Sequence, residues 1–139
     1  MKLNEMCRFL NQPNFGLLLM RFGLGGMMLA IGVSKFLEGS SALGQLGGAM
    51  SYIGIDFLPV MWGFFAAASM VGGGFFVVIG FLFRTSCFLI LLTMLVAISY
   101  HVHAGDDLIF GAGAHALKTA IAFFALMFVG PGRFSIQGE

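Results

Sequence analysis

Four long apolar segments dominate the chain, at about residues 15–37, 60–83, 86–104 and 112–130. A segment of about 20 residues crosses a hydrocarbon core about 30 Å thick at 1.5 Å per residue. Backbone N–H and C=O groups find no water in lipid, so each crossing segment must satisfy its own hydrogen bonds as a helix. The segments also lack the period-two alternation of membrane β-strands. The sequence therefore predicts an all-α fold, an integral membrane bundle of four transmembrane helices.

The composition supports a lipid environment. Charged residues make up only 9% of the 139 residues and apolar residues 59%, whereas soluble domains carry about 25% charged residues. The length fits a single domain over residues 1–139. A net charge of +1 leaves no basic face for phosphates, which argues against a nucleic-acid partner. The lipid bilayer is the expected partner.

The first 14 residues are polar and show no pattern that predicts a regular element. A basic start before an apolar run resembles a signal peptide, but the run is too long and no small-residue cleavage site closes it. We interpret this segment as a cytoplasmic tail that precedes the first span.

Loop charges predict the orientation of the bundle. Basic residues fall in the two tails and the second connection, and acidic residues fall in the other two connections. The tails and the second connection hold Lys2, Arg8, Arg84 and Arg133, whereas the other two connections hold Glu38, Asp56, Asp106 and Asp107, with Lys35 as the only nearby base. The positive-inside rule then places both termini in the cytoplasm, in a multi-pass protein of the inner (cytoplasmic) membrane.

The first outer connection, Glu38–Pro59, is long and broken by glycines. Leu43, Leu46, Met50 and Ile53 give it a weak helical stripe, which predicts a short interfacial helix on the outer surface. Glycines also cluster inside the first two spans, where they favour close helix–helix packing, as at Gly26-x-x-x-Ala30.

The candidate site lies around Ser99–Lys118, which holds all three histidines. Polar groups at membrane depth are costly and mark either a functional site or a paired structural one. We expect five basic groups to converge on the outer third of the bundle if their faces point inward: His101, His103, His115, Lys118 and Lys35.

Arg21 lies about six residues into the first span, and no acid lies at depth in any span. Arg21 can snorkel to the inner headgroups. Alternatively, Arg21 and Lys118 reflect a site for a small anion or for a polarised carbonyl such as a quinone oxygen.

A metal site is the competing interpretation. His101, His103, His115 and Asp106 could ligate zinc or copper where Gly105 ends the helix. Lys118 beside that cluster disfavours a cation. A third interpretation treats the histidines as ordinary interfacial residues.

Three motifs give the chain a resemblance to the DoxX family. They are Leu17-Leu18-Leu19-Met20-Arg21-Phe22-Gly23-Leu24-Gly25 leading to Gly32-Val33-Ser34-Lys35-Phe36, Gly72-Gly73 through Gly80-Phe81-Leu82-Phe83-Arg84, and Gly130-Pro131-Gly132-Arg133-Phe134-Ser135. The order and spacing of these motifs, over about residues 16–136, carry the resemblance.

The resemblance implies a small subunit of a membrane redox complex, since the family is named for a subunit of a thiosulfate:quinone oxidoreductase. It implies a partner, either a redox subunit or a second copy of the chain in a homo-oligomer. The chain has no recognisable cofactor motif of its own, so a quinone is the one cofactor that the resemblance suggests. Two positions depart from the family pattern: Ser69 and Lys118 stand where many members carry acids.

The predicted function is therefore a DoxX-like redox subunit, thiol-, sulfur- or quinone-linked, that binds an anion or quinone near the outer face. The candidate binding residues are Arg21, Lys35, Ser69, His101, His115 and Lys118. The rival hypotheses are a non-enzymatic metal-handling or transport component and a structural membrane scaffold.

Overall fold

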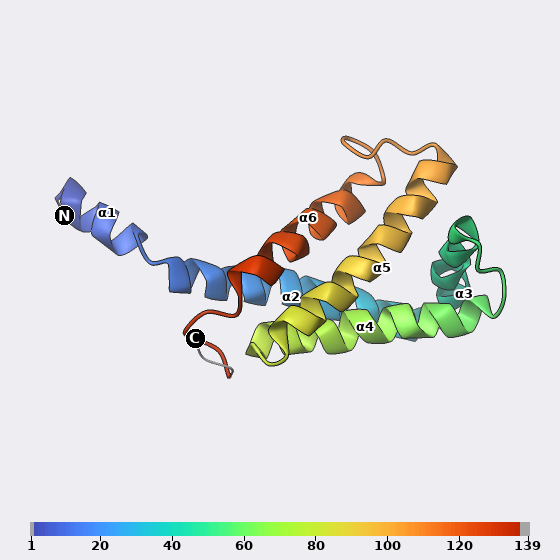
Figure 1. Ribbon diagram of the computed structural model, residues 1–139, viewed down its shortest axis with the longest axis horizontal. Coiled ribbons are helices and arrows are strands. Elements are labelled where there is room, and N and C mark those ends of the chain that lie inside the picture. The colour runs from blue at the N-terminus through green and yellow to red at the C-terminus, as the bar shows by residue number, and fades with distance from the viewer. Residues whose placement is uncertain (1, 137–139) are drawn as a thin grey trace.

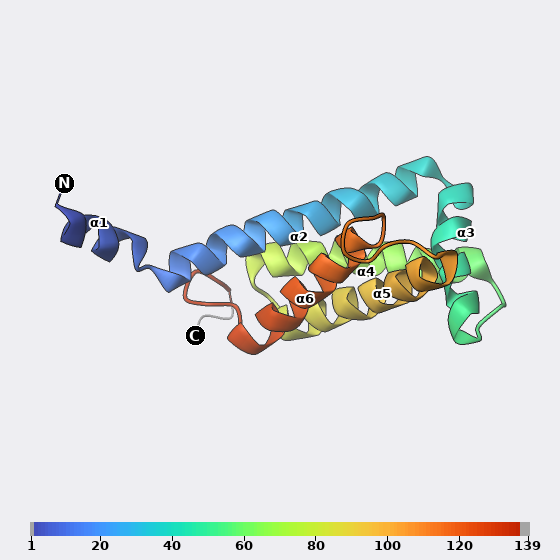
Figure 2. The same ribbon diagram turned by 90° about the horizontal axis from the view of Figure 1, so that it is seen from above.

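The computed structural model describes residues 2–136, apart from the side chains of Phe9 and Leu10, and all regular structure among them is helical. The elements in chain order are α1 (Leu3–Leu10), α2 (Pro13–Glu38), α3 (Ser40–Gly48), the 3-10 helix η1 (Ala49–Ile53), α4 (Pro59–Ile79), α5 (Phe83–Ala104) and α6 (Ala114–Val129). Figures 1 and 2 show α2, α4, α5 and α6 running along the length of the molecule, with α3 lying across one end.

Three of the described helices, α2, α4 and α5, are long and apolar enough to cross a membrane. The fourth apolar helix, α6, has 16 residues, or about 24 Å at 1.5 Å per residue, which is short of a 30 Å core.

The turn between α4 and α5 lies earlier in the chain than predicted. Gly80 ends α4 with a φ of 74° and Leu82 precedes α5 with a φ of 45°.

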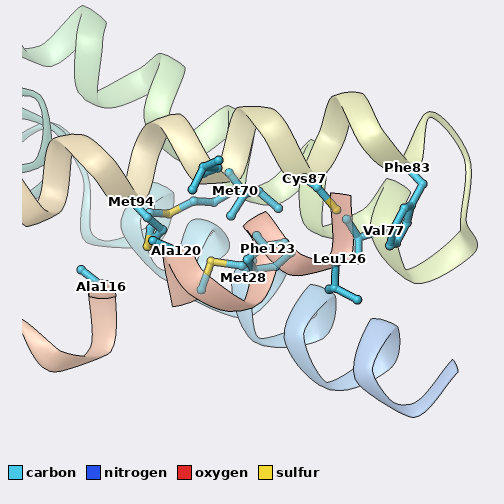
Figure 3. Packing of buried hydrophobic residues seen from close by; sticks show 12 residues of the cluster. Met28, Met70, Val77, Phe83, Cys87, Met94, Ala116, Ala120, Phe123 and Leu126 are labelled. Atoms are coloured by element: carbon cyan, nitrogen blue, oxygen red, sulfur yellow. The ribbon is translucent and has the colours of Figure 1, made fainter. Parts of the chain in front are cut away.

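The buried core lies where α2, α4, α5 and α6 meet. Figure 3 shows Met28, Met70, Cys87 and Phe123, one from each of these helices, among the side chains of this cluster. Cys87 and Phe123 are fully buried. In lipid these contacts stabilise the bundle through close packing, because the surrounding tails are as apolar as the core.

Glycines bring α2 and α4 into backbone contact. A Cβ added to Gly74 would lie 2.6 Å from the carbonyl oxygen of Gly25, and a Cβ on Gly25 would lie 2.8 Å from that of Gly74. The prediction of close packing through small residues is confirmed, but the predicted pair was wrong. A Cβ on Gly26 would meet nothing within 4 Å, and Ala30 is exposed. Periodicity alone did not show which glycines face α4.

The predicted helix in the first connection is present as α3 and η1, and it packs directly on α4. A Cβ on Gly47 would lie 1.6 Å from the carbonyl oxygen of Pro59, and one on Gly63 would lie 1.7 Å from that of Leu43. Only glycine fits this crossing of α3 over the start of α4. We call this end of the bundle the α3 end and the opposite end, where the C-terminal segment lies, the Arg21 end.

Residues 3–10, for which the sequence predicted no regular element, form the helix α1. Figures 1 and 2 show α1 extending away from the bundle at the Arg21 end. Leu3, Met6 and Cys7 fall on one side of this helix, a pattern too short to stand out in a polar segment.

Gly74→Ala tests the α2–α4 contact. We expect this variant to unfold at a lower temperature in detergent micelles, with a loss of about 1–3 kcal/mol, because the new methyl forces two backbones apart. Gly72→Ala is the matched control, since its Cβ meets nothing within 4 Å. The measurement is the unfolding midpoint, the temperature at which the monodisperse protein is lost. Equal midpoints for the Gly74→Ala and Gly72→Ala variants would contradict the α2–α4 contact.

Candidate functional site

A groove of about 490 Å³ opens between α4 and α5, below η1. We call it the α4–α5 groove. Its walls are apolar, with Phe65 and Ala66 from α4, Leu92 and Val96 from α5, and Met50 from η1 among the residues that line it. Its polar side chains are Trp62, Ser69 and Thr93. A concave apolar site with a few polar groups is the usual form of a small-molecule site.

The indole N–H of Trp62 is buried and has no hydrogen-bond partner, and no other buried side-chain N or O atom in the described part of the chain shares that state. A buried donor without an acceptor costs about 1–3 kcal/mol, so such groups are rare and call for an explanation. Trp62 is also one of the residues that line the α4–α5 groove, so its N–H is a candidate donor for a ligand that offers an oxygen.

The two hydroxyls of the groove are both held by their own helices. Ser69 Oγ donates to the carbonyl oxygen of Phe65 at 2.8 Å, and Thr93 Oγ1 donates to that of Leu89 at 3.1 Å. Each oxygen keeps lone pairs free and each proton can be redirected by rotation about χ1. The groove therefore combines one unpartnered donor with two adaptable hydroxyls.

Aromatic and histidine side chains gather above the groove, at the α3 end. The Tyr52 ring of η1 contacts Tyr100 at a centroid distance of 5.7 Å and His103 at 4.8 Å. Both partners lie on the last turns of α5. These contacts join η1, which covers the groove, to the end of α5.

His101 forms the one histidine–carboxylate pair among the described residues. Its Nδ1 lies 2.7 Å from Asp106 Oδ2, across the left-handed Gly105 that ends α5. Asp107 faces its own loop instead, because its Oδ1 accepts hydrogen bonds from the backbone N–H groups of Ile109 and Phe110. The structure thus gives Asp106 and Asp107 different roles.

The predicted metal ligands do not form a metal centre. No group of three or more His, Cys, Asp or Glu residues within 2–136 is placed to hold an ion. His103 Nδ1 donates to the carbonyl oxygen of Ser99 at 2.8 Å, and His115 is exposed on α6. Of the predicted ligands His101, His103, His115 and Asp106, the structure pairs His101 with Asp106 and does not assemble the set as a metal centre within residues 2–136.

The predicted convergence of basic side chains is also absent. His115 and Lys118 are exposed and lie outside the buried face of α6, which carries Ala116 and Thr119. Lys35 lies on the last turn of α2, where its Nζ is 3.4 Å from Glu38 Oε2. None of these three residues lines the α4–α5 groove.

Arg21 lies at the other end of the bundle and is only 1% exposed. Its guanidinium donates to the carbonyl oxygens of Val77 at 3.1 Å and Val78 at 2.7 Å, at the end of α4. It also donates to those of Pro131 at 3.2 Å and Phe134 at 2.5 Å, in the C-terminal segment. Neither predicted role holds, because Arg21 does not snorkel and cannot serve a site at the α3 end.

Among the candidate binding residues, the structure brings only Ser69 to the groove. Sequence reasoning missed Trp62 and Thr93 as site residues. A tryptophan at the start of a span is explained by the membrane interface, and a single threonine in a span is unremarkable. The spacing of Trp62, Phe65 and Ser69 on one helical face was the one signal in the sequence.

The family model described as DoxX matches residues 16–104. No curated protein and no solved structure matches the chain. The match covers α2 to α5 and ends before the Gly130–Ser135 segment, whose role in the structure is to supply carbonyl acceptors to Arg21.

Replacement of Arg21 tests its structural role. Arg21→Met leaves four carbonyl oxygens without their charged donor, so we expect a loss of about 3 kcal/mol or more in unfolding by detergent titration. The C-terminal segment should also become sensitive to carboxypeptidase. Arg84→Met, at an exposed position of the same end, is the control. A stable Arg21→Met protein with a protected C-terminal segment would contradict this role.

Proposed function

The chain belongs to the DoxX family, and we propose that it is a membrane subunit of a redox assembly that binds a quinone in the α4–α5 groove. With three helices long and apolar enough to cross a bilayer, it is a multi-pass membrane protein. The observation that carries the proposal is the buried, unpartnered N–H of Trp62 beside an apolar groove.

A quinone matches the groove in chemistry. Its ring is flat and apolar, and its only polar atoms are carbonyl oxygens that accept hydrogen bonds. The Trp62 N–H is a donor without acceptor capacity, and the Ser69 and Thr93 hydroxyls can donate to a second oxygen. A small sulfur anion fits less well, because the groove has no charged side chain and Arg21 is engaged elsewhere.

The side chains at the mouth of the groove suit entry from the lipid phase. Leu89, Leu92 and Leu95 line the groove and are 42%, 43% and 50% exposed. A lipid-soluble quinone can therefore enter sideways between the helices. The family resemblance, which implies a quinone-linked complex, favours this ligand over other carbonyl lipids.

Reduction of a quinone to a hydroquinone takes up two electrons and two protons. The chain has no recognisable redox-cofactor motif, so we assign the electrons to a partner subunit with a flavin or metal. The His101–Asp106 pair supports a proton route to the α3 end, since His101 follows the groove residue Ala97 by one helical turn. The chain then acts as an accessory quinone site.

We propose four spans, with α6 completed by its flanking residues, in the inner membrane with both termini cytoplasmic. Arg84 and Arg133 lie at the Arg21 end, and Glu38 and Asp106 lie at the α3 end. This segregation of charge supports the orientation. The groove and the His101–Asp106 pair then lie in the outer half.

Quinone binding is measured through Trp62, the only tryptophan of the chain. A soluble short-tail quinone titrated into the protein in nanodiscs should quench its fluorescence saturably. We expect Ser69→Ala and Thr93→Val each to weaken binding by about 5–10-fold, the value of one hydrogen bond. Ser34→Ala removes a similarly self-bonded hydroxyl from α2 and should leave affinity unchanged.

Trp62→Phe separates binding from folding. We expect weaker quinone binding by calorimetry, with the stability of the ligand-free protein unchanged or raised, because the variant removes an unsatisfied buried donor. Decylbenzene, which lacks the carbonyls, should compete poorly. Two results would contradict quinone recognition: decylbenzene binds as tightly as the quinone, or the quinone binds all three groove variants as tightly as the unmodified protein. In either case a structural scaffold whose groove holds lipid acyl chains would be the better interpretation.

Orientation is testable by cysteine labelling in a Cys7→Ser background, where the remaining Cys87 is fully buried. A membrane-impermeant maleimide should label Phe110→Cys in intact spheroplasts and Arg133→Cys only after the membrane is opened. Labelling of Arg133→Cys in intact cells would reverse the proposed topology.

A further inference from the structure

The short helix α1 (Leu3–Leu10) carries an apolar stripe that the bundle leaves uncovered. Met6 and Cys7 lie three and four residues after Leu3, which places all three on one side of a helix. Leu3 is 69% exposed and Met6 is 40% exposed. Figures 1 and 2 show α1 clear of the other helices.

The other side of α1 is polar and carries its charges in favourable positions. Asn4, Glu5 and Arg8 lie on this side by helical spacing. Glu5 lies in the first turn and Arg8 in the last, where each charge complements the helix dipole. Lys2 directly precedes the helix, so the segment has an excess of one basic group.

An eight-residue helix needs a surface to persist. Isolated helices shorter than about 12–15 residues are marginal in water, because nucleation is costly and few hydrogen bonds follow. Since the bundle provides α1 with no packing surface, something outside the described chain must cover its apolar stripe.

The membrane is within reach of α1. Only Asn11 and Gln12 separate it from Pro13, where the membrane-crossing helix α2 begins. The three residue steps from Leu10 to Pro13 span at most about 11 Å when fully extended. The apolar stripe is therefore tethered close to the bilayer surface.

We propose that α1 is a membrane-surface helix, which lies in the phospholipid headgroup layer at the Arg21 end. Leu3, Met6 and Cys7 enter the acyl boundary, and Lys2 and Arg8 contact lipid phosphates. The size of the stripe favours lipid over a protein partner, because a stable protein interface buries at least about 1,000 Å². The excess of basic charge favours an anionic leaflet.

The native Cys7 provides the probe, since the only other cysteine, Cys87, is fully buried. The full chain is spin-labelled at Cys7 in nanodiscs of phosphatidylcholine and phosphatidylglycerol. The label should collide more often with oxygen than with a water-soluble nickel chelate. In the double variant Cys7→Ser/Asn4→Cys, which moves the label to the polar side, the preference should reverse.

A charge placed on either side of α1 gives the matched comparison. Leu3→Glu should make the Cys7 label accessible to the nickel chelate, whereas Asn4→Glu, one residue away on the polar side, should not. Two outcomes would overturn the proposal. One is that the nickel chelate reaches the labels at Cys7 and at position 4 equally and that both labels move fast. The other is dipolar broadening between labels, which would show that a second copy covers the stripe.

Discussion

The buried guanidinium of Arg21 is the interaction on which the Arg21 end of the bundle depends. It donates to four carbonyl oxygens, two at the end of α4 and two in the C-terminal segment. Carbonyl groups at a helix C-terminus carry partial negative charge, so they compensate the guanidinium without a carboxylate. One side chain of α2 thereby fixes both the end of α4 and the path of the chain after α6.

The same face of α2 sets the distance between α2 and α4. Arg21, Gly25, Met28 and Gly32 recur at helical spacing and are all buried. Gly25 meets Gly74 backbone to backbone, one turn from the carbonyl groups that Arg21 binds. At the α3 end, Gly47 and Gly63 bring α3 onto α4 in the same way. These contacts hold α4 between α2 and α3, and they leave its other side free to form the groove with α5.

Sequence reasoning succeeded where hydropathy alone decides the outcome, and it failed where the direction of a side chain decides it. The apolar segments, the helix in the first connection and the family were predicted from residue patterns. The predicted basic pocket was not formed, because Lys118 and His115 lie outside the buried face of α6. Within residues 2–136, the predicted metal ligands were not brought together as a group of three or more either. Of the four predicted ligands, His101 and Asp106 meet, but no group of three or more His, Cys, Asp or Glu residues comes together in the described part of the chain.

The sequence by itself determined that this chain is helical and lives in a membrane, because long apolar segments with few charges have no other stable form in lipid. It also determined the family, through motifs that hold their order along the chain. Only the tertiary structure decided which side chains meet. Whether Arg21 faces lipid, a ligand or carbonyl groups depends on the rotation of α2 against α4. Likewise, only the tertiary structure decided that the N–H of Trp62 is buried without a hydrogen-bond partner and that Trp62 lines the α4–α5 groove.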